Sequence, residues 1–400
     1  MVPLFAQTPP KEKLIPMAAN VAPLFQPLEV GSLTLKNRVV MSALTRNRAV
    51  PNTVPNEVNV EYYRQRARGG AALIVSEGTL ITPQGTEWPY VPGISTDEHV
   101  QGWKKVTGGV HGEGGLIFCQ LWHTGRLSHP DAPEQKKSGP VYGPSAISAR
   151  GGKFRFLEGT PGYQIPTEID DPRQLIKLFK HAAENAKAAG FDGVELQGGN
   201  GYLIHQFLDS TSNKRTDHWG GSVKNRARFG LETLEVLSEV WGPDRVGVKL
   251  APTGGYNDMG MPLEETLETF RYFISEADKL GIAYFCLVRY QESADPVIDG
   301  IKRGTEHDVV GSYRSYIRNA RLFANGGILP DEAVKLVSEG NADAIVFGFL
   351  HVAHPDLAKR IQFGKPLHPE ATMKQYLNGP GGSVEDQVLG YTDYPEEKYD

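Results

Sequence analysis

Cysteine is scarce in this chain, with only Cys119 and Cys286 among 400 residues. Two cysteines cannot build the disulfide framework of a small secreted domain. They also cannot supply the cysteine cluster of a structural zinc site or an iron–sulfur centre. We therefore expect no metal site, and we expect the protein in a reducing compartment, the cytoplasm.

Long apolar runs and a strong charge of one sign are also missing. No stretch approaches the roughly 20 apolar residues that cross a bilayer, and residues 1–22 hold four prolines where a secretory signal would be apolar. The formal net charge is −5 without long charged runs, which argues against a nucleic-acid partner. These absences predict a small-molecule substrate, no membrane partner and a disordered N-terminal extension over residues 1–21.

What the chain does have is a repeated alternation of apolar runs and helical patterns. Nearly continuous apolar runs are typical of parallel strands buried on both faces. The alternation predicts an α/β fold with a single (β/α)8 TIM barrel over residues 22–400. The eight expected strands are residues 38–42, 72–78, 116–126, 193–197, 246–252, 284–288, 321–327 and 344–348.

Two segments fall outside this alternation. Residues 24–36 predict an N-terminal hairpin with its turn at Gly31 and Ser32. Residues 128–172, after the third strand, are rich in glycine, proline and polar side chains and lack a helical period. Because so long a bland loop is uncommon in a compact domain, we expect a lid or capping subdomain over the barrel mouth.

Polar and glycine residues gather where the expected strands end. Active sites of such barrels lie at the carboxyl ends of the strands. Glycines after the seventh and eighth strands also suit a backbone site for phosphate. The pattern predicts a binding cleft with a place for an anion, because so many polar residues at strand ends are not explained as solvated loop residues. The residues concerned are Thr45, Gly78, Gln120, Gln197, Asn200, Lys249, Gly326 and Gly348.

The most informative stretch is residues 193–207, where an expected strand ends in Gln197, Asn200 and Tyr202 among three glycines. Two amides and a phenol form a donor-rich site with a potential proton donor. The longer run from Asn200-Gly-Tyr-Leu-Ile-His-Gln-Phe to Phe229 resembles the Old Yellow Enzyme family. Its members are FMN-dependent reductases that pass hydride from NAD(P)H to an activated carbon–carbon double bond, and the resemblance spans about residues 24–395.

The resemblance implies a role for each matching position. Gln197 and Asn200 would clamp the substrate carbonyl oxygen, and Tyr202 would donate a proton to the α-carbon while hydride from flavin N5 reaches the β-carbon. Substrate contacts would also involve Trp122 and the C-terminal Tyr391. NADPH or NADH would be the reductant, and the protein would be a monomer or homodimer. The FMN-binding positions would be Ala43, Leu44, Thr45, Gly78, Gln120, Lys249, Asn325, Gly326, Gly327, Phe347, Gly348 and Phe349.

Three positions depart from the family pattern. Gln197 replaces a histidine, Lys249 replaces an arginine, and Phe349 replaces an arginine that contacts the phosphate. These changes motivate an alternative: a barrel of this lineage with weakened or no FMN binding, catalysing a non-redox isomerisation or cyclisation. A non-catalytic ligand-binding protein ranks lowest, because binding alone would not call for Thr45 and Tyr202.

Overall fold

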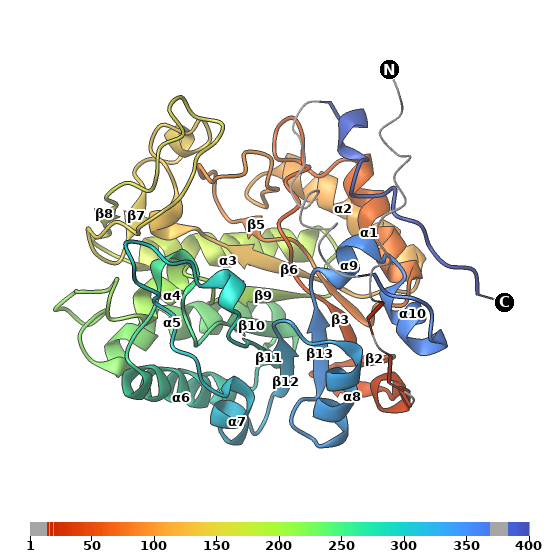
Figure 1. Ribbon diagram of the computed structural model, residues 1–400. Coiled ribbons are helices and arrows are strands. Elements are labelled where there is room, and N and C mark those ends of the chain that lie inside the picture. The colour runs from red at the N-terminus through yellow and green to blue at the C-terminus, as the bar shows by residue number, and fades with distance from the viewer. Residues whose placement is uncertain (1–13, 16, 19, 369–382, 400) are drawn as a thin grey trace.

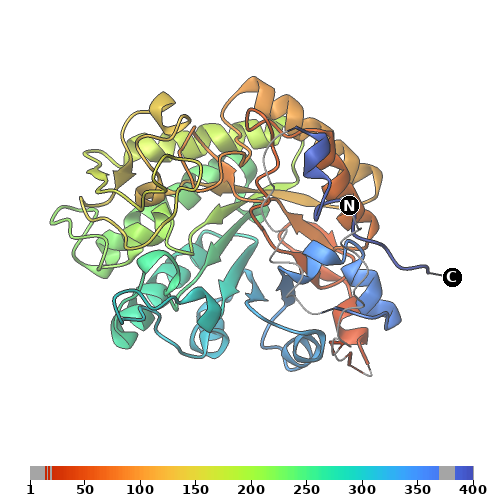
Figure 2. The same cartoon turned by 45° about the horizontal axis from the view of Figure 1, so that its top comes forward.

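Eight parallel strands form a closed barrel in the computed structural model, which describes residues 14, 15, 17, 18, 20–368 and 383–399 (Figures 1 and 2). The last strand pairs with the first, Ile345 opposite Val39, which closes the ring. This confirms the predicted TIM barrel. The strands in ring order are β3 (Val39–Met41), β4 (Leu73–Val75), β6 (Ile117–Trp122), β9 (Gly193–Gln197), β10 (Val246–Leu250), β11 (Tyr284–Val288), β12 (Arg321–Asn325) and β13 (Ala344–Phe347).

Large side chains fill the inside of the barrel, and glycines make room for them. Tyr284 stacks on Phe323 with ring centroids 4.3 Å apart. A Cβ atom on Gly193 would overlap the Phe118 ring, and one on Gly247 would overlap the Tyr284 ring. The strands are short and almost completely buried because one face meets this interior and the other meets the helices.

Helices cover the outside of the barrel, and some of them begin at ordinary capping residues. The Asn56 side chain accepts hydrogen bonds from the backbone of Val58 and Asn59, and Ser222 caps the longest helix in the same way. Short elements that the sequence did not predict are β5 (Thr79–Leu80) and α4 (Leu203–Leu208). The covering helices are α1 (Glu57–Arg68), α2 (Asp97–Gly112), α3 (Arg173–Ala188), α5 (Val223–Trp241), α6 (Leu263–Lys279), α7 (Val309–Tyr313), α8 (Pro330–Ser338), α9 (Leu350–Ala353) and α10 (Leu357–Phe363).

A hairpin lies against the amino ends of the strands. Its strands β1 (Leu28–Val30) and β2 (Leu33–Leu35) pair antiparallel around Gly31, whose φ of +55° favours glycine. Arg321 at the start of β12 donates from Nε to the Glu29 carbonyl oxygen at 2.7 Å. The hairpin therefore covers the end of the barrel opposite to the carboxyl ends of the strands.

The predicted N-terminal extension falls only partly within the described residues, because residues 1–13, 16 and 19 lie outside them. Ile15 donates its backbone N–H to the Leu367 carbonyl oxygen at 3.1 Å. Met17 and Val21 pack against the core. The chain therefore contacts the barrel before the predicted domain boundary at residue 22.

Residues 128–172 form a lobe beside the barrel, with β7 (Tyr142–Gly143) and β8 (Thr167–Glu168) paired in parallel (Figure 1). Arg215, which follows α4, donates from Nη1 to the carbonyl oxygens of Pro144 (3.2 Å) and Ile169 (2.7 Å). One buried guanidinium thus binds the residues that follow β7 and β8. Within the described part of the chain, no helix is both long and apolar enough to cross a membrane.

Candidate active site

A cavity of about 560 Å³ opens at the carboxyl ends of the barrel strands. This volume lies within the range of ordinary ligand and cofactor pockets. The structure brings together nearly every residue that the sequence predicted for the site. The predicted residues that line it are Ala43, Leu44, Thr45, Gly78, Gln120, Trp122, Gln197, Asn200, Tyr202, Lys249, Asn325, Gly326, Gly327, Phe347, Gly348 and Phe349.

Glycines let the strand ends approach one another around the cavity. A Cβ on Gly78 would lie 2.7 Å from the Trp122 ring, and one on Gly199 would lie 2.8 Å from the Ala251 nitrogen. Asn200 and Gly201 both have positive φ angles, +56° and +76°. This left-handed turn ends the path of β9 and brings Tyr202 back to the cavity wall.

The donors after β9 are held in place by their own neighbours. Gln197 accepts the Gly199 backbone N–H through Oε1 at 3.1 Å, which leaves its amide N–H groups to donate elsewhere. The Asn200 carbonyl oxygen accepts from Asn257 Nδ2 at 2.9 Å. The chain that carries both amides is therefore fixed before any ligand binds.

Tyr202 is buried and packs edge-on against Trp122, with ring centroids 4.8 Å apart and an interplanar angle of 81°. Burial raises the pKa of the Tyr202 phenol well above its ordinary value. The phenol is consequently protonated throughout the neutral range. It can donate a proton to a ligand in the cavity.

The base of the cavity carries a cation with a buried counter-charge. Lys249 donates from Nζ to Ser42 Oγ at 3.0 Å. Glu195 accepts from Gln120 Nε2 at 2.6 Å and from the Tyr284 hydroxyl at 2.9 Å. Burial raises the pKa of Glu195, while the charge of Lys249 opposes that shift. Among the described residues that line the cavity, Lys249 and Arg289 are cations and none is a carboxylate.

The sequence reading missed several lining residues with polar or aromatic side chains, among them Trp88, Tyr256, Arg289 and Gln291. Trp88 and Tyr256 lie in long loops well beyond a strand end, where no local pattern indicates the direction of a side chain. Arg289, however, directly follows β11. The rule that sites gather at strand ends would have identified it.

Tyr391 is the predicted site residue that the structure does not place on the cavity. Its ring is fully buried and stacks on Tyr62, with centroids 4.0 Å apart, and its hydroxyl accepts from Asn59 Nδ2 at 2.9 Å. Arg46 and Arg48 lie over the same ring at 4.9 and 4.7 Å. Tyr391 therefore lies apart from the described cavity lining, because α1 and the two arginines enclose the ring.

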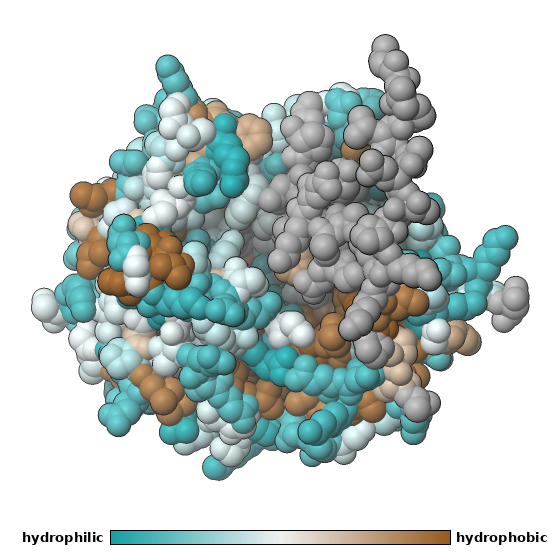
Figure 3. Space-filling view, in the orientation of Figure 1, coloured by the Kyte–Doolittle hydropathy of each residue, from teal (hydrophilic) through white to brown (hydrophobic). Residues whose placement is uncertain are grey.

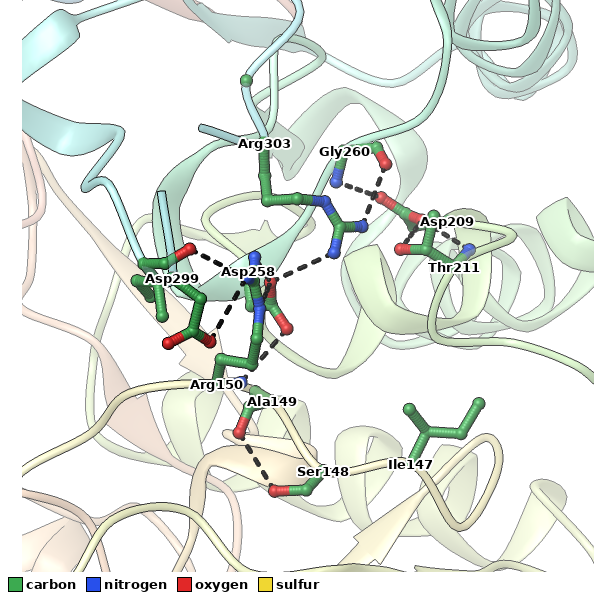
Figure 4. A network of polar contacts seen from close by, with 12 residues as sticks. Ile147, Ser148, Ala149, Arg150, Asp209, Thr211, Asp258, Gly260, Asp299 and Arg303 are labelled. Atoms are coloured by element: carbon green, nitrogen blue, oxygen red, sulfur yellow. Dashed lines mark hydrogen bonds and ion pairs between the residues drawn. The ribbon is translucent and has the colours of Figure 1, made fainter. Parts of the chain in front are cut away.

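An ion-pair network joins three loops at the cavity mouth (Figure 4). Asp258 accepts from Arg150 Nη2 at 2.8 Å and from Arg303 Nη1 at 3.1 Å. These residues come from the 128–172 lobe, from the loop after β10 and from the loop after β11. The lobe itself contributes no residue to the cavity lining. It acts on the described cavity through these neighbouring loops.

Exposed apolar side chains gather on the same side of the molecule, near β7 and β8 (Figure 3). The lobe contributes Phe156 and Ile165, and the loop after β11 contributes Val297 and Ile301. The two segments lie close together, since the Ile298 side chain would be 3.5 Å from a Cβ atom built on Gly151. A small apolar surface therefore borders the loops that frame the cavity.

A closed parallel barrel with donors, cations and glycines around one cavity at its carboxyl end defines an enzyme that holds an anionic cofactor. Comparison with known proteins specifies the family. The model of the NADH:flavin oxidoreductase / NADH oxidase family matches residues 23–368. The chain belongs to this family, the Old Yellow Enzymes, whose cofactor is FMN with NAD(P)H as the reductant.

Several relatives match almost end to end. An NADP-dependent oxidoreductase of Aspergillus flavus is 38% identical over 380 residues, covering 93% of this chain and 96% of the relative. A 12-oxophytodienoate reductase of Arabidopsis thaliana is 33% identical, with coverages of 94% and 96%. The structure of morphinone reductase is 36% identical with a TM-score of 0.81, covering 94% of this chain and 96% of that one. The old yellow enzyme from Trypanosoma cruzi is 29% identical with a TM-score of 0.83, covering 94% and 100%.

The residues present fit FMN. Gly326 and Gly327 have φ angles of +106° and +66°, a backbone conformation that can turn successive N–H groups toward an anion. A Cβ on Gly348 would find its nearest neighbour at 3.7 Å, so space is open in front of it. The buried Nε1 atom of Trp122, a residue of the cavity wall, has no hydrogen-bond partner among the described residues. A phosphorylated, hydrogen-bonding cofactor suits this combination.

Three buried histidines close behind the site predict a loss of stability in acid. Burial lowers the pKa of His123 to about 3, of His351 to about 3 and of His205 to about 4. The unfolded chain takes up these protons near pH 6.5 while the folded protein does not, so stability is full above pH 6.5 and falls as the pH drops. A shift of three units corresponds to roughly 4 kcal/mol for one histidine.

Urea unfolding of the holoprotein between pH 7.5 and 4 measures this effect. We expect His351→Leu to flatten the decline, because its side chain cannot be protonated in the unfolded chain. The matched variant His181→Leu, at a histidine exposed in the folded protein, should keep the wild-type slope. Equal slopes for wild type and His351→Leu would contradict the prediction.

Proposed function

We propose that this protein reduces an activated carbon–carbon double bond, such as that of an α,β-unsaturated carbonyl compound, at the expense of NAD(P)H. The observation that carries the proposal is the convergence of Gln197, Asn200, Tyr202 and Trp122 on one cavity that also fits FMN. When bound, FMN accepts hydride from NAD(P)H and supplies it to the alkene. The chain's own residues bind, orient and protonate the substrate.

Gln197 and Asn200 bind the substrate carbonyl oxygen in this proposal. The Gln197 amide keeps its N–H groups for a ligand because its oxygen is engaged by Gly199. Two amide donors on a rigid turn stabilise negative charge as it develops on the oxygen. Gln197 cannot become a cation, so this clamp depends on hydrogen bonding alone.

Tyr202 supplies the proton to the α-carbon. Its burial keeps the phenol protonated, and its contact with Trp122 limits the directions in which the hydroxyl can point. A positioned acid of this kind typically contributes a factor of about 10²–10⁴ to the rate. Lys249 holds a positive charge at the cavity base, where it stabilises negative charge on the reduced cofactor.

The test follows the visible spectrum of the purified holoprotein under anaerobic conditions. We expect NADPH to bleach the flavin absorbance and a following addition of 2-cyclohexenone to restore it, with one saturated ketone formed per flavin. If NADPH bleaches the flavin absorbance but 2-cyclohexenone does not restore it, the protein reduces its flavin without reducing this alkene. The fit of the cavity to FMN weighs against the non-redox alternative, which would require turnover of a substrate without flavin or NADPH.

A further inference from the structure

We propose that Arg289 binds the phosphate group of FMN, and that Glu332 competes with this phosphate for the Arg289 guanidinium. The inference rests on FMN as the cofactor and is independent of the alkene reduction proposed above. It assigns a phosphate-binding role to a residue outside the position at which the family carries its arginine, because that position is Phe349 here.

The position of Arg289 beside the glycine pair is the first support. It lies on the cavity wall immediately after β11, and its guanidinium donates to the Gly326 carbonyl oxygen from Nε at 3.3 Å and from Nη2 at 3.2 Å. A Cβ on Gly326 would also lie 3.0 Å from the backbone nitrogen of Arg289, so the two strand ends are close together. The guanidinium is thus tied to the backbone that turns at Gly326 and Gly327.

The charge distribution of the cavity is the second support. Its two lining cations are Lys249, which is buried and bonded to Ser42 at the base, and Arg289, which is 27% exposed beside Gly326. A phosphate at the glycine pair therefore meets Arg289 as the nearest lining cation. A guanidinium presents several N–H groups in a planar fork that matches phosphate oxygens.

Glu332, in the first turn of α8, already binds the Arg289 guanidinium. A phosphate must therefore displace this carboxylate or bind the guanidinium together with it. Arg289 donates to both of its carboxylate oxygens, with Nη2 at 3.0 Å from Oε2 and a shorter contact between Nη1 and Oε1. Glu332 is 41% exposed, so water can solvate it when the guanidinium turns toward the phosphate. A dianion should win this competition because its charge is larger and it binds in a site rich in backbone donors.

The experiment compares FMN with riboflavin, which lacks only the phosphate. Apoprotein is titrated with each flavin while quenching of flavin fluorescence is measured. We expect Arg289→Gln to weaken FMN binding by about tenfold or more and to leave riboflavin binding unchanged. Glu332→Gln should tighten FMN by roughly three- to tenfold, again without an effect on riboflavin.

Arg314→Gln is the matched control, because it removes another half-buried ion pair, Arg314 with Asp343 at 2.8 Å, away from the cavity. It should leave both flavins unaffected. The proposal is overturned if Arg289→Gln weakens both flavins equally or neither, or if Glu332→Gln fails to tighten FMN. If Arg289→Gln changed only the ratio of NADPH to NADH affinity, the proposal would also be overturned. A wild-type protein that binds neither flavin would instead contradict the FMN dependence.

Discussion

Replacing Tyr202 by phenylalanine should lower the rate of alkene reduction by about 10²–10⁴ while the reduction of the flavin by NADPH keeps its wild-type rate. The variant removes one oxygen from a buried ring that packs on Trp122, so the cavity wall keeps its shape. Proton transfer belongs to the second half of the cycle only. Stopped-flow measurement of the two half-reactions separates them directly.

Tyr256→Phe provides the control for a phenol in the same cavity. Tyr256 lines the cavity, and burial raises its pKa to about 12, so both phenols are protonated at neutral pH. Its loss should change the rate of alkene reduction by less than about tenfold, since no proton transfer is assigned to it. If Tyr202→Phe reduces the substrate as fast as wild type, the proton comes from water or another group.

The second large effect is expected from removing a donor of the oxygen clamp. Gln197→Glu keeps an acceptor for the Gly199 N–H but replaces the amide donors with a negative charge. Asn200→Asp likewise replaces an amide donor with a negative charge, at a position whose φ of +56° tolerates aspartate. Each variant should lower kcat/KM for alkene reduction by about 10²–10³, the usual cost of losing one oxyanion donor.

Two further variants test whether the effect belongs to the clamp. Gln291→Glu places the same negative charge elsewhere on the cavity lining and should cost less than the changes at Gln197 and Asn200. Gln197→His restores a donor that can carry charge and should equal or exceed the wild-type rate. If all three acidic variants lower kcat/KM equally, the cause is the added negative charge in the cavity. The result would then contradict a specific role of Gln197 and Asn200 in binding the carbonyl oxygen.

The barrel could be predicted from the sequence because its strands are buried on both faces. Runs such as residues 246–252 and 284–288 are short and mostly apolar, and the structure places a strand within each. Most of the site followed from the same fact, since Lys249, Asn325 and Gly348 lie at strand ends that must meet around one mouth.

The remaining residues depend on contacts that no local pattern encodes. Tyr391 matches an aromatic position of the family by sequence, yet its surroundings are set by Tyr62 and Arg46, more than 300 positions away, which enclose it. Tyr256 reaches the cavity through a loop that the Asp258–Arg150 pair holds, and Trp88 follows Glu87, which accepts from the Tyr163 hydroxyl at 3.0 Å. Such pairings become visible only in three dimensions.

The pairing of β13 with β3 has a consequence for how the protein is synthesised. The cofactor cavity is lined both by residues that follow β3 and by residues that follow β13, about 300 positions later. A nascent chain therefore cannot hold FMN until β13 has left the ribosome and closed the ring. Until that moment, the free edges of β3 and β12 are exposed strands that can pair with other chains.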